Sequence, residues 1–271
     1  MFGLLKKVGE QAGRTNLSLL AAGVAFYALL AITPAATALV TLYGLLFNIA
    51  DVQSQVTALD GILPAEARKL VADQLASIVT TDSSRLSIGF IVALALALWS
   101  ANSGTSALMS ALDVAYGETE KRGILAYYGQ ALLLTFGAIL FGVAALALIA
   151  VLPAAVALLP LGDYGELISW LRWPALLCLW PLGLAILYRY APSHSEPRFA
   201  LISRGAIAAT LLWLAGSALF SLYVGHFASY DRTYGSLGAV VILLLWLWLT
   251  CFTILLGAAL NRQLRRARQE A

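Results

Sequence analysis

Four polar side chains lie at helical spacing within the apolar stretch WSANSGTSALMSALD, where amide, hydroxyl and carboxyl groups could bind a solute or one another. Asn102, Ser106, Ser110 and Asp113 are separated by steps of four, four and three residues, so a helix would place them on one face. Polar groups surrounded by apolar residues need partners. This polar stripe is therefore either hydrogen-bonding glue between helices or the wall of a hydrated substrate path, and both interpretations stay open.

The carboxylate of Asp113 is the member of the stripe with the strongest chemical requirement. An acidic group near the end of an apolar helix is costly unless a cation or water compensates its charge. Lys121 and Arg122 follow in the next loop and offer one source of such a partner.

A second group of residues with chemical potential stands in YDRTYG, directly before a long apolar run. Asp231 and Arg232 form an opposite-charge pair, Tyr230 and Tyr234 are suited to an interface, and Gly235 permits a turn. An interfacial anchor accounts for these residues. An outer gate or a head-group contact is the sharper alternative, and spacing does not choose between them.

Enzyme chemistry finds little support in the sequence. The two histidines, His194 and His226, are placed on opposite membrane faces by the topology derived below, so they cannot share a metal site. The sequence contains no P-loop, dinucleotide fingerprint or GxSxG elbow. We therefore expect no enzyme activity, no metal and no cofactor.

Composition identifies the environment in which these residues act. Of 271 residues, 61% are hydrophobic and 11% charged, whereas soluble domains have about a quarter charged residues. The net charge of +3 is too small to indicate a nucleic-acid partner. Six continuously apolar segments predict an all-α bundle of six membrane spans in one domain. They cover roughly residues 17–47, 86–109, 123–152, 167–188, 201–224 and 237–260.

The distribution of Lys and Arg predicts the orientation of these spans. Alternate loops together with the termini contain 12 of the 17 basic residues, and the opposite side contains five. The positive-inside rule therefore predicts that both termini are cytoplasmic and that YDRTYG faces outward. The arginines of the basic tail, residues 261–271, lie where each could gain about 1 kcal/mol from anionic lipid. We expect membrane lipids as partners, with topology anchoring as the main task of the tail.

Two further features bear on the shape of the bundle. The segment ILPAEARKLVADQLASIV, residues 62–79, predicts an outer amphipathic helix between the first two spans, either a connector or a lid. Pro34 in the first span, with Pro174 and Pro181 in the fourth, removes backbone donors and favours kinks. Kinks can line transport sites or can be static features of membrane helices.

Three segments resemble the YihY/BrkB family of bacterial inner-membrane proteins, over essentially the whole chain. They are AAGVAFYALLAITPAATALVTLYGLL, ALMSALDVAYGETEKRG, and SLYVGHFASYDRTYGSLGAVVILLLWLWLT with LLGAALN. The resemblance implies six spans with cytoplasmic termini and a link to the cell envelope and virulence. It also implies that the ribonuclease BN label long attached to the family is mistaken. The family-like residues are Gly23, Phe26, Tyr27, Pro34, Tyr223, Tyr230, Asp231, Tyr234, Gly235, Ser236 and Asn261.

One departure from the family pattern affects the mechanism that the resemblance implies. The family typically has an acidic residue in a closing GAELN-like motif, where this chain has GAALN with Ala259. This difference argues against a proton-coupled mechanism through that position.

The sequence as a whole predicts a transporter or lipid-handling protein of the inner membrane that acts on a small molecule or a lipid. The alternative is a non-transporting scaffold that organises envelope partners. The sequence assigns neither the substrate nor the oligomeric state.

Overall fold

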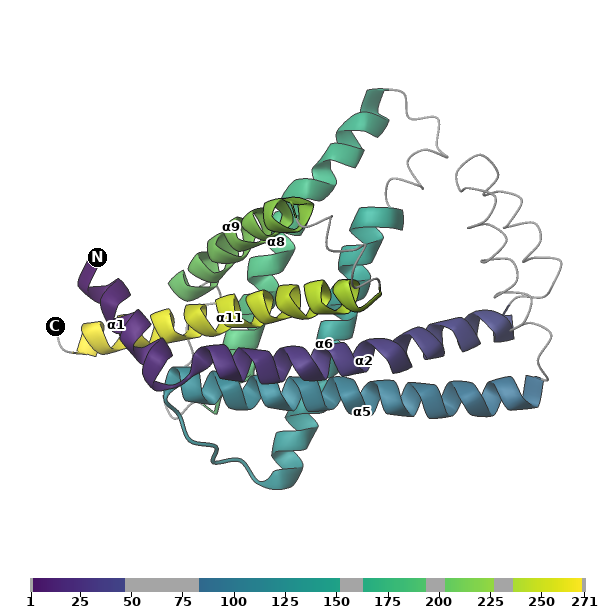
Figure 1. Ribbon diagram of the computed structural model, residues 1–271, viewed down its shortest axis with the longest axis horizontal. Helices are drawn as coiled ribbons and strands as arrows, with labels where there is room; N and C mark the ends of the chain where they lie inside the picture. The colour runs from purple at the N-terminus through teal and green to yellow at the C-terminus, as the bar shows by residue number, and fades with distance from the viewer. Residues whose placement is uncertain (1, 47–82, 152–162, 194–202, 227–235, 270–271) are drawn as a thin grey trace. The chain divides into compact units, whose positions relative to one another are not determined.

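The computed structural model describes residues 2–46, 83–151, 163–193, 203–226 and 236–269, and every regular element within these ranges is helical. Figure 1 shows these elements in chain order. They are α1 (Phe2–Arg14), α2 (Leu17–Leu46), α5 (Ser83–Tyr116), α6 (Ile124–Leu146), the π-helical turn η1 (Ala147–Val151), α8 (Asp163–Tyr190), α9 (Arg204–His226) and α11 (Ser236–Gln269). The predicted all-α fold is confirmed.

Six of these helices contain candidate membrane spans, as the sequence predicts. The spans are Leu17–Ala35, Ile88–Tyr116, Ile124–Ile149, Trp170–Tyr190, Arg204–Val224 and Val240–Ala267. The shortest has 19 residues, which at 1.5 Å per residue gives about 28 Å, close to the thickness of a hydrocarbon layer. Two helices run further than hydropathy predicts. The second span continues past Met109 to Tyr116 because buried residues, among them Leu112 and Ala115, keep packing along α5.

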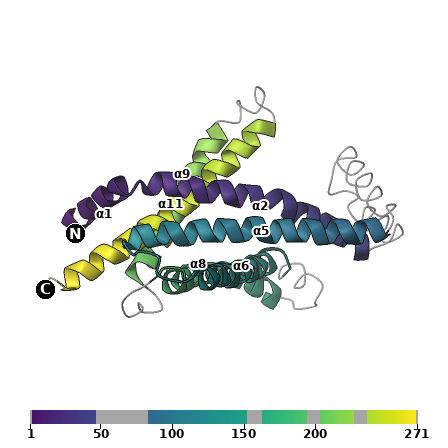
Figure 2. The same ribbon diagram turned by 90° about the horizontal axis from the view of Figure 1, so that it is seen from below.

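The final helix also exceeds its predicted span. α11 continues without a break through the basic segment to Gln269, so residues 261–269 of the predicted tail are helical. Asn261 lies at 2% exposure on this extension, which is therefore partly packed into the protein. Figures 1 and 2 both place the last turns of α11 near α1, so the two ends of the described chain lie close together.

The chain forms two compact parts, of which the larger comprises residues 1–27 and 102–271. Its core contains the fully buried side chains of Leu17, Met109, Leu112, Tyr188 and Leu255. Large apolar side chains are exposed elsewhere on its helices, for example Leu125, Leu133 and Leu140 of α6. Such a surface would be unfavourable in water and matches the hydrocarbon interior of a bilayer. The smaller part, residues 28–101, has exposed apolar side chains as well, including Ile88 and Ile91.

The closest helix pair in the larger part is α9 with α11, which lie side by side in Figures 1 and 2. Gly205 and Gly257 face each other at this crossing. A Cβ atom added at Gly257 would lie 2.6 Å from the carbonyl oxygen of Gly205 and 2.4 Å from the hydroxyl of Tyr188. Only glycine leaves room for such a close backbone approach, as in other membrane helix pairs.

The structure does not test three of the predicted features: the proline kinks, the amphipathic segment and the YDRTYG motif. Pro34 lies inside α2, and Pro174 and Pro181 lie inside α8; each helix continues through its prolines, and the kinks stay predictions. The amphipathic segment 62–79 and the YDRTYG motif, with Tyr230, Asp231, Arg232, Tyr234 and Gly235, lie outside the described residues.

Candidate functional site

The polar stripe of α5 contacts α6 through one tyrosine. The Tyr127 hydroxyl donates to the carbonyl oxygen of Ser106 at 2.7 Å, and the Ser110 hydroxyl lies 2.8 Å from the same Tyr127 oxygen. Because the single phenolic proton goes to Ser106, the Ser110 hydroxyl is the donor in the second bond. Ser110 thus forms a hydrogen bond between two helices, which is one of the two interpretations of the stripe.

Asn102 and Ser106, the first two residues of the stripe, differ from Ser110 in their hydrogen bonding. The Oδ1 atom of Asn102 and the Oγ atom of Ser106 are buried, and neither has a hydrogen-bond partner among the described residues. They lie one helical turn apart on the same face of α5. A buried polar atom without a partner costs about 1–3 kcal/mol, so these two positions require water, a solute or another polar group.

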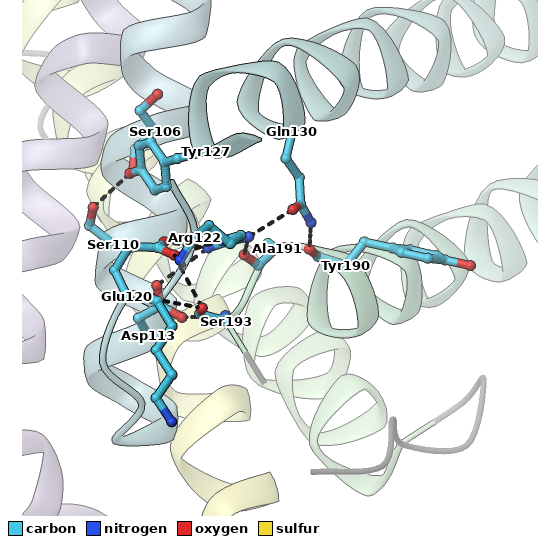
Figure 3. A network of polar contacts seen from close by, with 11 residues as sticks. Ser106, Ser110, Asp113, Glu120, Arg122, Tyr127, Gln130, Tyr190, Ala191 and Ser193 are labelled. Carbon is cyan, nitrogen blue, oxygen red and sulfur yellow. Dashed lines mark hydrogen bonds and ion pairs between the residues drawn. The ribbon is translucent and has the colours of Figure 1, made fainter. Parts of the chain in front are cut away.

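Asp113 at the lower end of the stripe belongs to a dense polar cluster that Figure 3 shows from close by. The backbone N–H of Ser193 donates to Oδ1 of Asp113 at 2.6 Å, and Nη2 of Arg122 lies 3.6 Å from Oδ2. The prediction that the following loop supplies a basic partner for Asp113 is confirmed by Arg122. Both side chains are mostly buried, at 7% exposure for Asp113 and 16% for Arg122.

Arg122 is the centre of this cluster. Its guanidinium binds Glu120 through two parallel bonds, from Nε to Oε1 at 2.8 Å and from Nη2 to Oε2 at 2.6 Å. Its Nη1 donates to Oε1 of Gln130 at 2.9 Å and to the carbonyl oxygen of Ala191 at 3.1 Å. Bidentate, charge-assisted bonds of this kind are stronger and more directional than neutral ones. We call Asp113, Glu120, Arg122, Gln130 and Ser193 the Arg122 clamp.

The clamp joins the ends of three helices. Asp113 is in the last turn of α5, Gln130 is in α6, and Ser193 follows the end of α8, where Gln130 also donates to the carbonyl oxygen of Tyr190. The guanidinium of Arg122 further lies 5.5 Å from the ring centre of Tyr127, a cation–π distance. Through Tyr127 the clamp is directly connected to the polar stripe (Figure 3).

The local sequence explains how the clamp is positioned. α5 ends in a Schellman motif, in which the N–H of Gly117 bonds to the carbonyl of Val114 at 3.1 Å and that of Glu118 to the carbonyl of Asp113 at 2.8 Å. Gly117 has φ = 69°, a left-handed conformation that favours glycine. This turn reverses the chain directly after α5. As a result, Glu120 and Arg122 return to Asp113 within nine residues.

The two charged residues of the loop strengthen each other's ionisation. Hydrogen bonding from the Arg122 side chain lowers the pKa of the Glu120 carboxyl to about 2, from an ordinary value of 4.5. The same hydrogen bonds raise the pKa of the Arg122 guanidinium above its ordinary value. Both groups are therefore charged at neutral pH.

The lowered pKa of Glu120 predicts a pH dependence of stability. The unfolded chain takes up the Glu120 proton near its ordinary pKa of 4.5, whereas the folded chain takes it up only near 2. The stabilisation is thus complete above about pH 4.5 and is lost as the pH falls through about 2. We expect unfolding measured at about pH 5 and about pH 3 to show a smaller decrease in stability for Glu120→Gln than for the unchanged protein. Equal decreases would contradict this expectation.

A second buried polar cluster lies at the α9–α11 crossing, around Asn261. Its Nδ2 donates to the Tyr116 hydroxyl at 3.1 Å and to the Ser203 hydroxyl at 2.9 Å, and its Oδ1 accepts from the Gly205 N–H at 2.8 Å. Asn261 thereby covers the N-terminus of α9 and fixes it against α11 and α5. This family-like residue has a packing role in the structure, and the neighbouring Ala259 is fully buried.

Within the described residues, no group of three or more His, Cys, Asp or Glu side chains could hold a metal ion. The sequence did not point to Glu120, Tyr127, Gln130 or Ser193 as site residues. For Glu120 the ETEKRG loop behind Asp113 is a usable signal. Ser193 lies 80 residues from Asp113 along the chain, and spacing alone does not reveal such a contact.

The described residues form six apolar helices of spanning length, and buried polar clusters join five of them, α5, α6, α8, α9 and α11. These features define a multi-pass α-helical membrane protein. The chain belongs to the virulence factor BrkB family, whose profile matches residues 8–271.

Three relatives show how far this similarity extends. The chain is 30% identical over 213 residues to the ribonuclease-like protein YfkH of Bacillus subtilis (strain 168), covering 76% of this chain and 75% of the relative. It is 25% identical to the UPF0761 membrane protein IL2447 of Idiomarina loihiensis, covering 96% and 89%. A UPF0761 membrane protein of Xanthomonas campestris pv. campestris (strain B100) is 41% identical over 78 residues, 28% of this chain and 18% of the relative. No solved structure matches the chain.

These similarities establish a multi-pass membrane protein of a bacterial family. The relatives' names do not show an enzymatic activity, since two of the three describe only a membrane protein and the third states a likeness to ribonucleases.

Proposed function

We propose that the protein is a non-enzymatic transporter or lipid-handling protein that moves a small polar molecule or a lipid at the bacterial inner membrane. One observation carries the proposal: Asn102 Oδ1 and Ser106 Oγ are buried in a membrane-spanning helix and have no hydrogen-bond partner among the described residues. In hydrocarbon such atoms are unfavourable, whereas along a hydrated path water or a substrate would satisfy them.

The remainder of the stripe supports a path that is closed at one end. Ser110 is bonded to Tyr127, and Asp113 is held by Ser193 and Arg122. In our proposal, Asn102 and Ser106 line the hydrated section, and the Arg122 clamp closes it. The excess of Lys and Arg in the loops on that side supports a cytoplasmic position for the clamp and for both termini.

Cysteine accessibility tests the hydrated section. Single cysteines at Asn102, Ser106, Ser110 and Asp113 are introduced into protein whose exposed Cys178 and buried Cys251 have been replaced. We expect a membrane-impermeant thiol reagent to label Asn102→Cys and Ser106→Cys, because water reaches these positions. A cysteine at the fully buried Met109 serves as the protected control, and one at the exposed Leu133 of α6 reports lipid contact without hydration.

Reconstituted protein tests the movement of a substrate. Liposomes containing the protein are assayed for flux of anionic metabolites and for redistribution of fluorescent phospholipids between leaflets. We expect one of these activities to exceed that of empty liposomes, and modification of Ser106→Cys to reduce it. Protection of Asn102→Cys and Ser106→Cys in folded protein, together with no activity, would overturn the proposal. Stable partners captured by crosslinking in cells would then favour a scaffold.

A further inference from the structure

An open groove of about 480 Å³ lies in the larger part, between the α1–α2 junction and α11. It is lined by Ala12, Gly13 and Asn16 at the α1–α2 junction and by Trp248 and Phe252 of α11. The two rings are stacked almost in parallel, with centroids 5.3 Å apart and planes at 7°. A volume of this size lies within the range of small-ligand sites. The small residues of α1 leave this half-buried aromatic wall partly open.

The position of α1 is fixed by polar contacts, so the groove is a built feature. Gln11 donates from Nε2 to the carbonyl oxygen of Ala115 at 2.6 Å, and Gln263 of α11 donates to Oε1 of Gln11 at 2.7 Å. Val8 is buried on the same side of α1. These contacts anchor α1 to α5 and α11 and so hold together the two walls of the groove, to which Gly13 and Trp248 belong.

The groove changes character along its length. Trp248 and Phe252 belong to the last membrane span, and Leu19, which is 72% exposed, belongs to the first. The indole N–H of Trp248 donates to the carbonyl oxygen of Ser18 at 3.0 Å, so this wall presents carbon to an occupant. Asn16, by contrast, precedes the first span, is exposed and has φ = 50°. An occupant therefore meets an apolar section within the membrane and a polar section at its surface.

The helix that contributes the polar section, α1, carries positive charge. Lys6, Lys7 and Arg14 of α1 are all exposed, against one exposed acidic residue, Glu10. Arg14 directly follows Gly13 in the last turn of α1. Basic residues beside a membrane surface attract anionic lipid, and an amphipathic helix such as α1 suits the interface. The charge of α1 therefore complements a negative head group, and the aromatic wall complements an acyl chain.

We propose that this groove binds an anionic phospholipid, with one acyl chain against Trp248 and Phe252 and the head group at Asn16 and Arg14. The site is separate from the polar stripe, and its occupancy does not depend on the proposed transport function. The lipid would hold α1 in the plane of the membrane surface.

Quenching of tryptophan fluorescence by brominated lipid tests this site directly. The full-length protein is reconstituted in phosphatidylcholine vesicles in which a minority of the lipid is brominated phosphatidylglycerol or, in parallel, brominated phosphatidylcholine. The contribution of Trp248 is the quenching that disappears in Trp248→Phe. We expect brominated phosphatidylglycerol to quench Trp248 more strongly than brominated phosphatidylcholine at equal fraction. We also expect Arg14→Gln to reduce that preference about fivefold, the factor equivalent to ~1 kcal/mol per basic residue.

A matched pair of variants shows whether the groove itself is the site. Gly13→Phe would fill the groove and decrease the quenching of Trp248, whereas Gly9→Phe, one turn earlier on the same helix, would leave it unchanged. Both glycines have open space around them, so both variants should fold. Equal quenching by the two lipids would show ordinary contact with surrounding lipid and overturn the proposal. Absence of quenching with both lipids, with crosslinks between copies through Gly13→Cys, would assign the groove to a second copy instead.

Discussion

Replacing Gly257 with alanine is expected to lower the free energy of unfolding by about 3 kcal/mol, the upper end of the usual cost of overpacking. The new methyl group would lie 2.4 Å from the Tyr188 hydroxyl, 2.6 Å from the Gly205 carbonyl oxygen and 2.7 Å from the Ala209 Cβ. Backbone on one side leaves no flexible group to move aside, so α9 and α11 must separate. That separation would also disturb the bond from the Tyr188 hydroxyl to the carbonyl oxygen of Ile254, which is 2.6 Å long.

A second glycine of the same helix pair provides the control. A Cβ at Gly216 of α9 would lie 3.2 Å from the terminal Cδ1 atom of Leu249, a flexible side chain that can rotate. Gly216→Ala should therefore change stability by less than about 1 kcal/mol. Denaturant unfolding of the purified protein, followed through tryptophan fluorescence, measures both variants. Similar stabilities for Gly257→Ala and Gly216→Ala would show that the close crossing does not limit the packing of α9 on α11.

The second large effect concerns the Arg122 clamp. Arg122→Gln should destabilise the protein by about 3 kcal/mol, because removal of one partner leaves the buried charge of Asp113 uncompensated. The substitution also removes the bonds to Glu120, Gln130 and the Ala191 carbonyl oxygen. The ends of α5, α6 and α8 would then lose their shared contact.

A double-mutant cycle separates the ion pair from the other contacts of Arg122. Asp113→Asn removes the buried charge and keeps an oxygen that can accept from the Ser193 N–H. In the Arg122→Gln background this change should restore about 1–2 kcal/mol, since the two groups interact directly. If the two substitutions were simply additive, the ion pair at 3.6 Å would not contribute to the stability of the clamp.

The sequence predicted the spans well because continuous hydropathy over about 20 residues is set by the bilayer itself. It also placed the polar stripe on one face of α5 and offered Lys121 and Arg122 as the source of a partner for Asp113, since both follow from local spacing. It did not separate Ser110, which is bonded to α6, from Ser106, whose hydroxyl has no partner within the described ranges. That distinction depends on where Tyr127 of a neighbouring helix lies, and periodicity along one helix has no information about it.

The same reason explains why α11 extends beyond the span that the sequence predicted for it. Hydropathy falls after Leu260, so the following arginines indicated a tail, yet Asn261 is buried against Ser203 and Tyr116. Contacts between residues this distant in sequence appear only after the helices have packed. Gly257 is the first residue of the GAALN motif, but the spacing within that motif does not reveal its close contact with Gly205.

The unbroken course of α11 has a mechanical consequence. Its 34 residues form a rod of about 50 Å, and the same rod carries the aromatic wall at Trp248, the crossing at Gly257 and the contact of Gln263 with α1. If an unbroken helix tilts as a rigid body, residues along its whole length move together. Any rocking of α11 against α9 would therefore displace Trp248 and Gln263 in the same movement, so lipid contact, helix crossing and the N-terminal helix would respond as one unit.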